Sequence, residues 1–299
     1  MSQPHRSVVP PWGLALAAML SVQLGSALSV GLIEEVGAAG TAWLRLTIGA
    51  VIFLAIARPP LRQVTRADLV PLIGLGVMTG LVTIAFLAAI ERIPLGTAVA
   101  IEFLGPLTVA AVRGRGGRAL AWPLLALVGV VLLTRPWHGT VNVDGVTYAV
   151  LAAFGWAGYI VLTQKLGDRF SGLSGLSMTV PIAAVTAGVV GIPQAAGHLS
   201  PRVLLIAAGL ALLLPVIPFA LELLALRELT PTAFGTLMAL EPAMGVLLGL
   251  VVLGQRAAPI QLLGVALVVL AGAMAQRGGR RAAGDVPRPP VHSELDLIG

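Results

Sequence analysis

The sequence predicts an all-α integral membrane protein in which ten transmembrane helices form two inverted five-helix repeats. Its composition is apolar, with 57% hydrophobic and 11% charged residues, whereas soluble domains carry about 25% charge. Apolar runs long enough to cross a bilayer recur along the chain. Prolines also recur at a nearly fixed spacing, because Pro94 and Pro231 are 137 residues apart and Pro106 and Pro242 are 136 apart.

The apolar runs define the expected helices. A polar tail over residues 1–10 precedes the first run, which is longer than the hydrophobic region of an ordinary signal peptide and is followed by many further spans. Backbone groups in lipid must be satisfied internally, so each run is interpreted as a helix. The ten predicted helices cover residues of about 12–33, 38–57, 68–89, 94–112, 119–134, 145–163, 173–191, 202–224, 231–253 and 259–276.

The basic residues predict the orientation of these helices. With ten spans, fourteen arginines and lysines fall on one face of the membrane and four on the other, while Arg45 remains inside a span. Cytoplasmic loops are the richer in positive charge. We therefore expect a multi-pass protein of the inner (cytoplasmic) membrane with both termini in the cytoplasm. The four arginines on the opposite face are Arg92, Arg135, Arg202 and Arg256.

The repeat predicts how the chain divides. Because five helices per half is an odd number, the second half enters the membrane from the opposite side, and the repeats are inverted. We expect a first repeat over residues 11–137, a second over 142–277 and a disordered cytoplasmic tail over 278–299, which is rich in Gly, Pro and Arg. Inverted repeats are typical of secondary transporters, whose binding site lies near the membrane midplane.

Two glutamates lie deep in matching helices of the two halves. Glu102 is about eight residues into its apolar run, which is roughly 12 Å deep, and Glu241 lies at nearly the same depth. An acidic side chain there costs about 2.5–3.5 kcal/mol, so both are expected to face the bundle interior. Each lies beside a proline, Pro106 or Pro242, as in broken transport helices. We predict that they bind substrate and protons; the alternative is a structural carboxylate.

Five further side chains are candidates for the same cavity. Glu222 follows two prolines and lies nearer the cytoplasmic end, where it either joins the site or reaches the interface. Arg45 lies roughly 8 Å inside the second helix, where it either holds a substrate carboxylate, neutralises a glutamate or snorkels to the surface. Gln23, Trp156 and Tyr159 lie in the first and sixth helices and are interpreted as cavity lining or, for the aromatic pair, interfacial anchors.

Other classes of function lack the residues that they need. The chain has no cysteine, and its four histidines fall in loops or tails without ligand spacing. HExxH, GxSxG and Walker A motifs are absent, so we expect no enzyme, no metal and no cofactor. The basic residues form no basic face, which disfavours nucleic acid. The expected partners are a small-molecule substrate, protons and membrane lipids, in a monomer or a homodimer.

The segments AVAIEFLGPLTVAAV, TAWLRLTIGA and FGTLMALEPAMGVLLGLVVLGQ resemble the ten-helix EamA-type members of the drug/metabolite transporter (DMT) superfamily. The resemblance covers about residues 10–276, and EFLGP in the first copy is similar to the threonine/homoserine exporter branch. It implies export of small amino acids by proton antiport. Two alternatives remain: the same fold exporting drugs, cations or other metabolites, and a membrane sensor or assembly partner that transports nothing.

Overall fold

The chain folds into a bundle of helices. The described residues contain no strand, and seven of their helices are long and apolar enough to cross a membrane. Two shorter apolar helices, Ala121–Thr134 and Pro259–Ala275, accompany them. The expectation of an all-α membrane protein is therefore confirmed. This computed structural model describes residues 10–57, 59–113, 120–135, 137, 141–166, 172–229 and 231–278, so the two predicted tails lie almost entirely outside the described residues.

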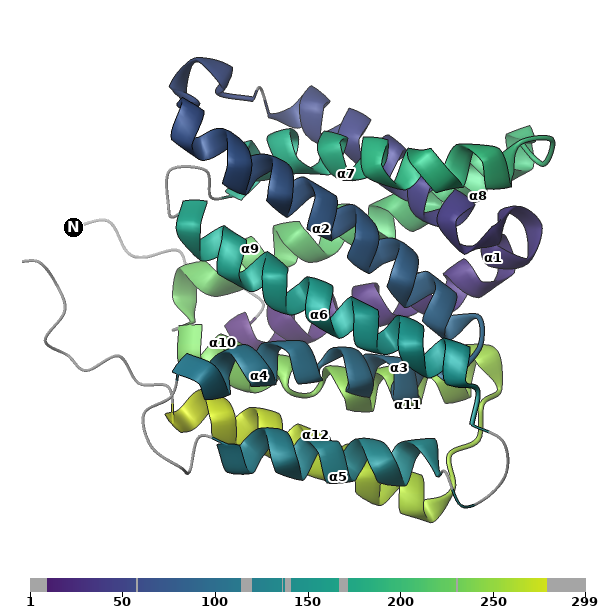
Figure 1. The fold of residues 1–299 in the computed structure, drawn as a ribbon, viewed down its shortest axis with the longest axis vertical. Coiled ribbons are helices and arrows are strands. Elements are labelled where there is room, and N and C mark those ends of the chain that lie inside the picture. The colour runs from purple at the N-terminus through teal and green to yellow at the C-terminus, as the bar shows by residue number, and fades with distance from the viewer. Residues whose placement is uncertain are drawn as a thin grey trace, which may run out of the picture.

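The first two predicted helices lie in one long element, α1 (Pro11–Ile56), which is broken at Gly37. Gly37 has a φ of 73° and a ψ of 168°, a conformation that suits a residue without a Cβ atom. Beyond the break, the backbone N–H groups of Ala39 and Gly40 donate to Oε1 of Gln194, over 2.8 and 3.0 Å. This side chain satisfies donors at the start of the second half, and α1 folds back on itself as a hairpin (Figure 1).

The fourth predicted span, 94–112, is interrupted in the structure. It consists of two short helices, α3 and α4, which meet at the turn residue Phe103. The elements between the end of α1 and residue 134 are η1 (Leu61–Gln63), α2 (Arg66–Ile90), α3 (Leu95–Glu102), α4 (Leu104–Arg113) and α5 (Ala121–Thr134).

Two later spans are also interrupted. The predicted helix over 202–224 contains a π-helical segment with an extended residue, Leu214, and the one over 231–253 contains a turn at residues 239–240. The elements are α6 (Val143–Leu166), α7 (Gly172–Ala195), α8 (Pro201–Ala211), η4 (Leu212–Val216), α9 (Ile217–Glu228), α10 (Pro231–Met238), α11 (Glu241–Leu253) and α12 (Pro259–Gly278).

Successive connections alternate between the two ends of the bundle (Figure 1). The start of α1 and the end of α12 lie at the same end. We call the other end, which contains the α1 turn at Gly37 and the connections 91–94, 196–200 and 254–258, the distal end. The connection from α5 to α6 also lies there.

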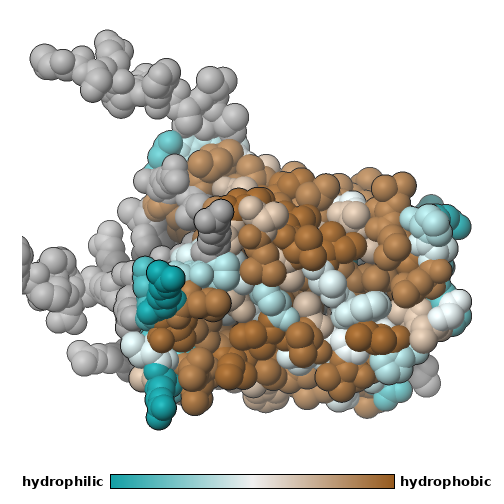
Figure 2. Space-filling model, turned by 90° about the horizontal axis from the view of Figure 1, so that it is seen from above, coloured by the Kyte–Doolittle hydropathy of each residue, from teal (hydrophilic) through white to brown (hydrophobic). Residues whose placement is uncertain are grey.

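The outer surface is apolar across the middle of the bundle. Large hydrophobic side chains point outward, including Val70, Phe154 and Leu205, which are 77%, 73% and 75% exposed. Figure 2 shows hydrophobic residues over the middle of the molecule and hydrophilic residues gathered towards its two ends. A soluble protein rarely exposes so large an apolar surface, so this band indicates contact with lipid.

Candidate functional site

Glu102 and Glu241 lie at the interruptions of two spans. Glu102 is the last residue of α3 and directly precedes the turn at Phe103. Glu241 is the first residue of α11 and directly follows the turn at residues 239–240. Glu241 is only 6% exposed, whereas Glu102 is half-buried. Both of the carboxylates that the sequence places deep in the membrane therefore lie where a helix breaks.

Close packing of α3 against α11 brings these two breaks together. A Cβ atom at Gly96 of α3 would lie 2.2 Å from Cγ2 of Val246, and one at Gly245 of α11 would lie 3.1 Å from Cγ2 of Val99. Glycine therefore lets the two backbones approach each other. Because α3 starts at the distal end and α11 ends there, the two helices run in opposite directions (Figure 1).

A third carboxylate, Glu222 of α9, joins this pair. Glu241 is close enough to both Glu102 and Glu222 for Coulombic interaction with each. Like charges repel strongly in a medium of low dielectric constant, so a bound cation relieves the repulsion within this group. We call Glu102, Glu222 and Glu241 the acidic cluster. Of the two interpretations of Glu222, its position here favours a place in the site.

The two predicted aromatic residues of α6 lie next to the acidic cluster. The Trp156 ring contacts the ring of Phe103, at a centroid distance of 6.3 Å and an angle of 70°. Since Phe103 follows Glu102, Trp156 lies beside the first helix break. Tyr159 lies within Coulombic range of Glu222. Both side chains are partly buried.

Arg45 and Gln23 are both buried polar residues of α1. Arg45 is 3% exposed and donates from Nη1 to Oγ of Ser29 over 2.8 Å, and the Ser29 hydroxyl donates to the carbonyl of Gly25 over 2.6 Å. Gln23 is 2% exposed. Among the described residues, Nε of Arg45 and Oε1 of Gln23 have no hydrogen-bond partner. These atoms are therefore an unused donor and an unused acceptor.

This placement narrows the options for Arg45. Its side chain is directed across the hairpin to Ser29 instead of extending to the surface, so it does not snorkel. No salt bridge joins Arg45 to a glutamate in the described part of the chain. Its position is compatible with a structural role through Ser29 and with contact to a bound anionic group.

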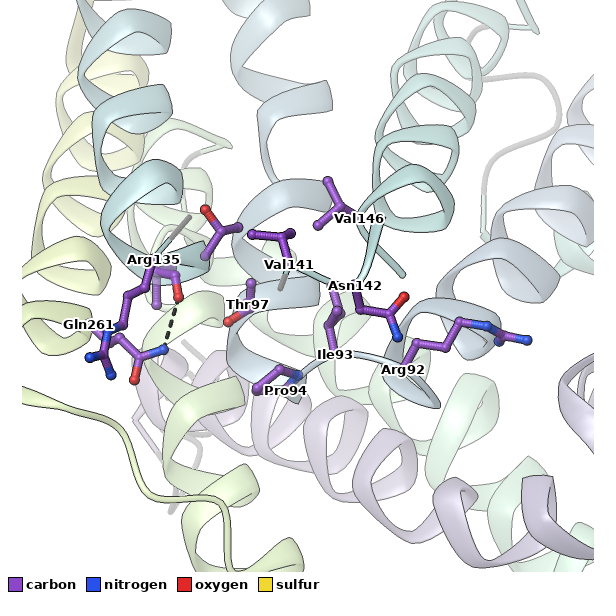
Figure 3. A pocket seen from close by; sticks show the side chains of 11 residues that line it. Arg92, Ile93, Pro94, Thr97, Arg135, Val141, Asn142, Val146 and Gln261 are labelled. Atoms are coloured by element: carbon purple, nitrogen blue, oxygen red, sulfur yellow. Dashed lines mark hydrogen bonds between the residues drawn. The ribbon is translucent and has the colours of Figure 1, made fainter. Parts of the chain in front are cut away.

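A cavity of about 350 Å³ lies at the distal end, where sequence reasoning expected no site (Figure 3). Its polar lining includes Thr97, Asn142, Gln261, Arg92 and Arg135, and none of the seven predicted site residues. These residues come from α3, α12 and the connections that follow α2 and α5. The available sequence signal was that Arg92 and Arg135 both belong to the sparse basic residues of one face.

The described residues show no grouping of His, Asp or Glu side chains close enough to hold a metal ion. Carboxylates bind an ammonium group or a proton, and the guanidinium of Arg45 binds an anion.

Comparisons with protein families, with curated proteins and with solved structures each find matches. A model described as the EamA-like transporter family matches residues 144–275. The threonine/homoserine exporter RhtA of Escherichia coli K12 is 34% identical over 270 residues, which cover 87% of this chain and 89% of the relative. RhtA of Salmonella typhimurium LT2 is 34% identical over 265 residues, covering 86% and 88%. A solved crystal structure aligns with a TM-score of 0.57 and 20% identity, covering 90% of this chain and 99% of the other, which supports the fold alone.

Proposed function

Because this chain belongs to the EamA-like transporter family of the drug/metabolite transporter superfamily, we propose that it exports small amino acids of the threonine/homoserine kind across the inner membrane. The export is proton antiport with alternating access. The observation that carries this proposal is the acidic cluster at two helix breaks inside an apolar bundle. The names of the relatives support the substrate class, and the acidic cluster supports the coupling to protons.

The proposed architecture is ten spans in two inverted repeats, over residues 11–137 and 142–277. The hairpin in α1 supports it, because the break at Gly37 divides 46 helical residues into two lengths that each suit a span. The opposite directions of α3 and α11, each with a glutamate at a break, support the inversion. The charge bias of the loops supports cytoplasmic termini, with the distal end facing outward.

In the proposed cycle, the acidic cluster binds either protons or the ammonium group of the substrate. Both ligands relieve the repulsion among the same three carboxylates, so the occupancy of one opposes the occupancy of the other. Such competition for one set of groups is what couples two opposite fluxes in an antiporter. Trp156 and Tyr159 border the space in which the substrate's side chain is held.

The substrate's carboxylate is assigned to Arg45. A guanidinium binds carboxylates through paired N–H donors, and Nε of Arg45 is a buried donor with no partner among the described residues. Oε1 of Gln23 is a buried acceptor that suits a substrate hydroxyl. Threonine and homoserine carry an ammonium, a carboxylate and a hydroxyl group, and the three sets of side chains provide a complement for each.

The test is transport by the purified protein in proteoliposomes loaded with labelled threonine. An inward proton gradient is expected to accelerate efflux from the wild type, and the double variant Glu102→Gln/Glu241→Gln is expected to lose this acceleration. Glu34→Gln, which changes an exposed glutamate of α1, is the matched control. Unchanged gradient-driven efflux in the double variant would exclude the proposed coupling. The substrate class is tested by counterflow, in which unlabelled homoserine and a lipophilic cation are compared as the solute that exchanges with labelled threonine.

A further inference from the structure

Two adjoining cavities at the distal end share one preformed wall. The cavity of about 350 Å³ and a second of about 40 Å³ are both lined by Pro94, Thr97, Leu133 and Gln261. The Gln261 side chain is fixed at both ends, since its Nε2 donates to the carbonyl of Leu133 over 2.9 Å and its Oε1 accepts from the N–H of Ala258 over 2.9 Å. The wall is therefore in place without a ligand.

The charges that line these cavities are all positive. Arg92 and Arg135 line the larger cavity and Arg256 lines the smaller one, whereas no carboxylate of the described residues lines either. Arg92 is already engaged, because it pairs with Glu91 and lies 5.1 Å from the ring centre of Tyr148. In Figure 3 its guanidinium extends away from the cavity.

The other two arginines, Arg135 and Arg256, form no salt bridge with a carboxylate of the described residues. Arg135 lies beside Gln261 at the opposite side of the larger cavity (Figure 3), and its buried Nε has no hydrogen-bond partner among the described residues. Arg256 forms no salt bridge in the described part of the chain. A concave surface with uncompensated charge of one sign concentrates ligands of the opposite sign.

The wall lies a fixed distance from the acidic cluster. Thr97 is five residues before Glu102 on α3, and Val246, which lines the smaller cavity, is five residues after Glu241 on α11. Five helical residues span about 7.5 Å, which exceeds the separation of the ammonium and carboxylate groups within one α-amino acid. A ligand in these cavities has therefore left the acidic cluster.

We propose that these two cavities form an exit-side site that binds the carboxylate of the departing amino acid through Arg135 and Arg256. This inference rests on the proposed function, in which the distal end faces outward. The acidic cluster attracts the ammonium end of the substrate from within, and the arginines attract its carboxylate end towards the exit. When protons neutralise the acidic cluster, its attraction for the ammonium group weakens, and the substrate then favours the exit-side site.

The absence of cysteine from the chain allows a test that does not depend on transport. Thr134 lines the larger cavity and has an exposed hydroxyl, so Thr134→Cys gives a single reporter thiol. Its reaction rates with an anionic and a cationic methanethiosulfonate reagent of similar size are measured in a neutral detergent. The anionic reagent is expected to be favoured, and adding Arg135→Gln/Arg256→Gln should lower the ratio of the two rates at least about tenfold.

Two variants control this measurement. Arg202→Gln removes a charge at the same end of the bundle from a side chain that is 78% exposed, pairs with Glu35 at 3.6 Å and lines neither cavity. It should leave the rate ratio unchanged. Arg135→Lys/Arg256→Lys keeps both charges and should retain most of the preference for the anionic reagent, which separates an electrostatic effect from misfolding.

Occupancy is tested by protection of the reporter thiol. Threonine and 3-hydroxybutyrate, which has the carboxylate without the ammonium, should slow labelling, whereas 1-amino-2-propanol should not. Equal protection by the amine, an unchanged rate ratio in the double arginine variant, or protection by phosphatidylglycerol alone would overturn the inference. Glu102→Gln/Glu241→Gln, which neutralises two carboxylates of the acidic cluster, should keep the rate ratio and show at least the wild-type protection by threonine, so a failure of the exit site is distinguishable from a failure of proton coupling.

Discussion

The two interrupted spans, α3–α4 and α10–α11, contain the same elements in opposite order. In the first, the glutamate ends the distal half-helix, and in the second it begins that half-helix, because the chain runs the other way. Both distal half-helices pack against each other through glycine. Two spans that run in opposite directions therefore each have a carboxylate at a helix break, next to the contact between α3 and α11.

The two glutamates are nevertheless not equivalent. Glu241 is at a helix N-terminus, where the helix dipole interacts favourably with negative charge, and Glu102 is at a C-terminus, where it does not. Glu241 is also the more buried of the two and interacts with both other members of the acidic cluster. We infer that Glu241 is the central ligand of the cluster and Glu102 a supporting one.

The largest effect is expected from Glu241→Gln. Because this side chain interacts with both other carboxylates, its loss removes the shared cation position, and proton-driven threonine efflux should fall at least about a hundredfold. The measurement is initial efflux from proteoliposomes under a pH gradient, normalised to reconstituted protein. Efflux within threefold of the wild type would remove Glu241 from the centre of the site.

Glu102→Gln is expected to have a smaller effect, of about tenfold in the same assay. The Glu222–Glu241 pair remains, so one position for a cation persists. A larger loss in Glu102→Gln than in Glu241→Gln would reverse the inferred order. Glu34→Gln again provides the matched control.

The sequence was sufficient to predict an all-α membrane protein, its family and the two carboxylates within apolar spans. Apolar runs follow directly from the bilayer thickness, and a charged residue within such a run is conspicuous. The place where α1 turns was also predicted, since the gap between residues 33 and 38 contains Gly37. All of these features follow from the residues within one segment of the chain and do not depend on contacts between distant segments.

Other features depend on contacts between distant segments. Arg45 lies within snorkelling distance of a helix end, yet the folding back of α1 buries it against Ser29, sixteen residues away. The distal cavity combines residues as far apart as Arg92 and Gln261. Its arginines carry no motif that marks them as a group, because only helix packing brings them together. A single sequence does not specify that packing.

The glycines between the two interrupted spans permit a finer test of the comparison. At Gly96, an added Cβ atom would also lie 2.9 Å from the backbone nitrogen of Val246, which cannot rotate away. Gly96→Ala is therefore expected to destabilise the protein by about 1–3 kcal/mol. The measurement is the free energy of unfolding in a denaturing-detergent titration. An unchanged free energy would show that α3 and α11 are less closely packed than described.

The smallest effect is expected on the other side of the same contact. At Gly245, an added Cβ atom would lie 3.1 Å from Cγ2 of Val99 and 3.2 Å from Cα of Gly96, so it needs a shift of only a few tenths of an ångström. Alanine also favours a helix over glycine by about 0.5–1 kcal/mol, so the net change in unfolding free energy for Gly245→Ala should be below about 1 kcal/mol. Gly209→Ala of α8, where no atom lies within 4 Å, isolates the helix-forming contribution. A cost for Gly245→Ala as large as that for Gly96→Ala would mean that both helices are equally constrained, and the asymmetry between the two spans would then be confined to their carboxylates.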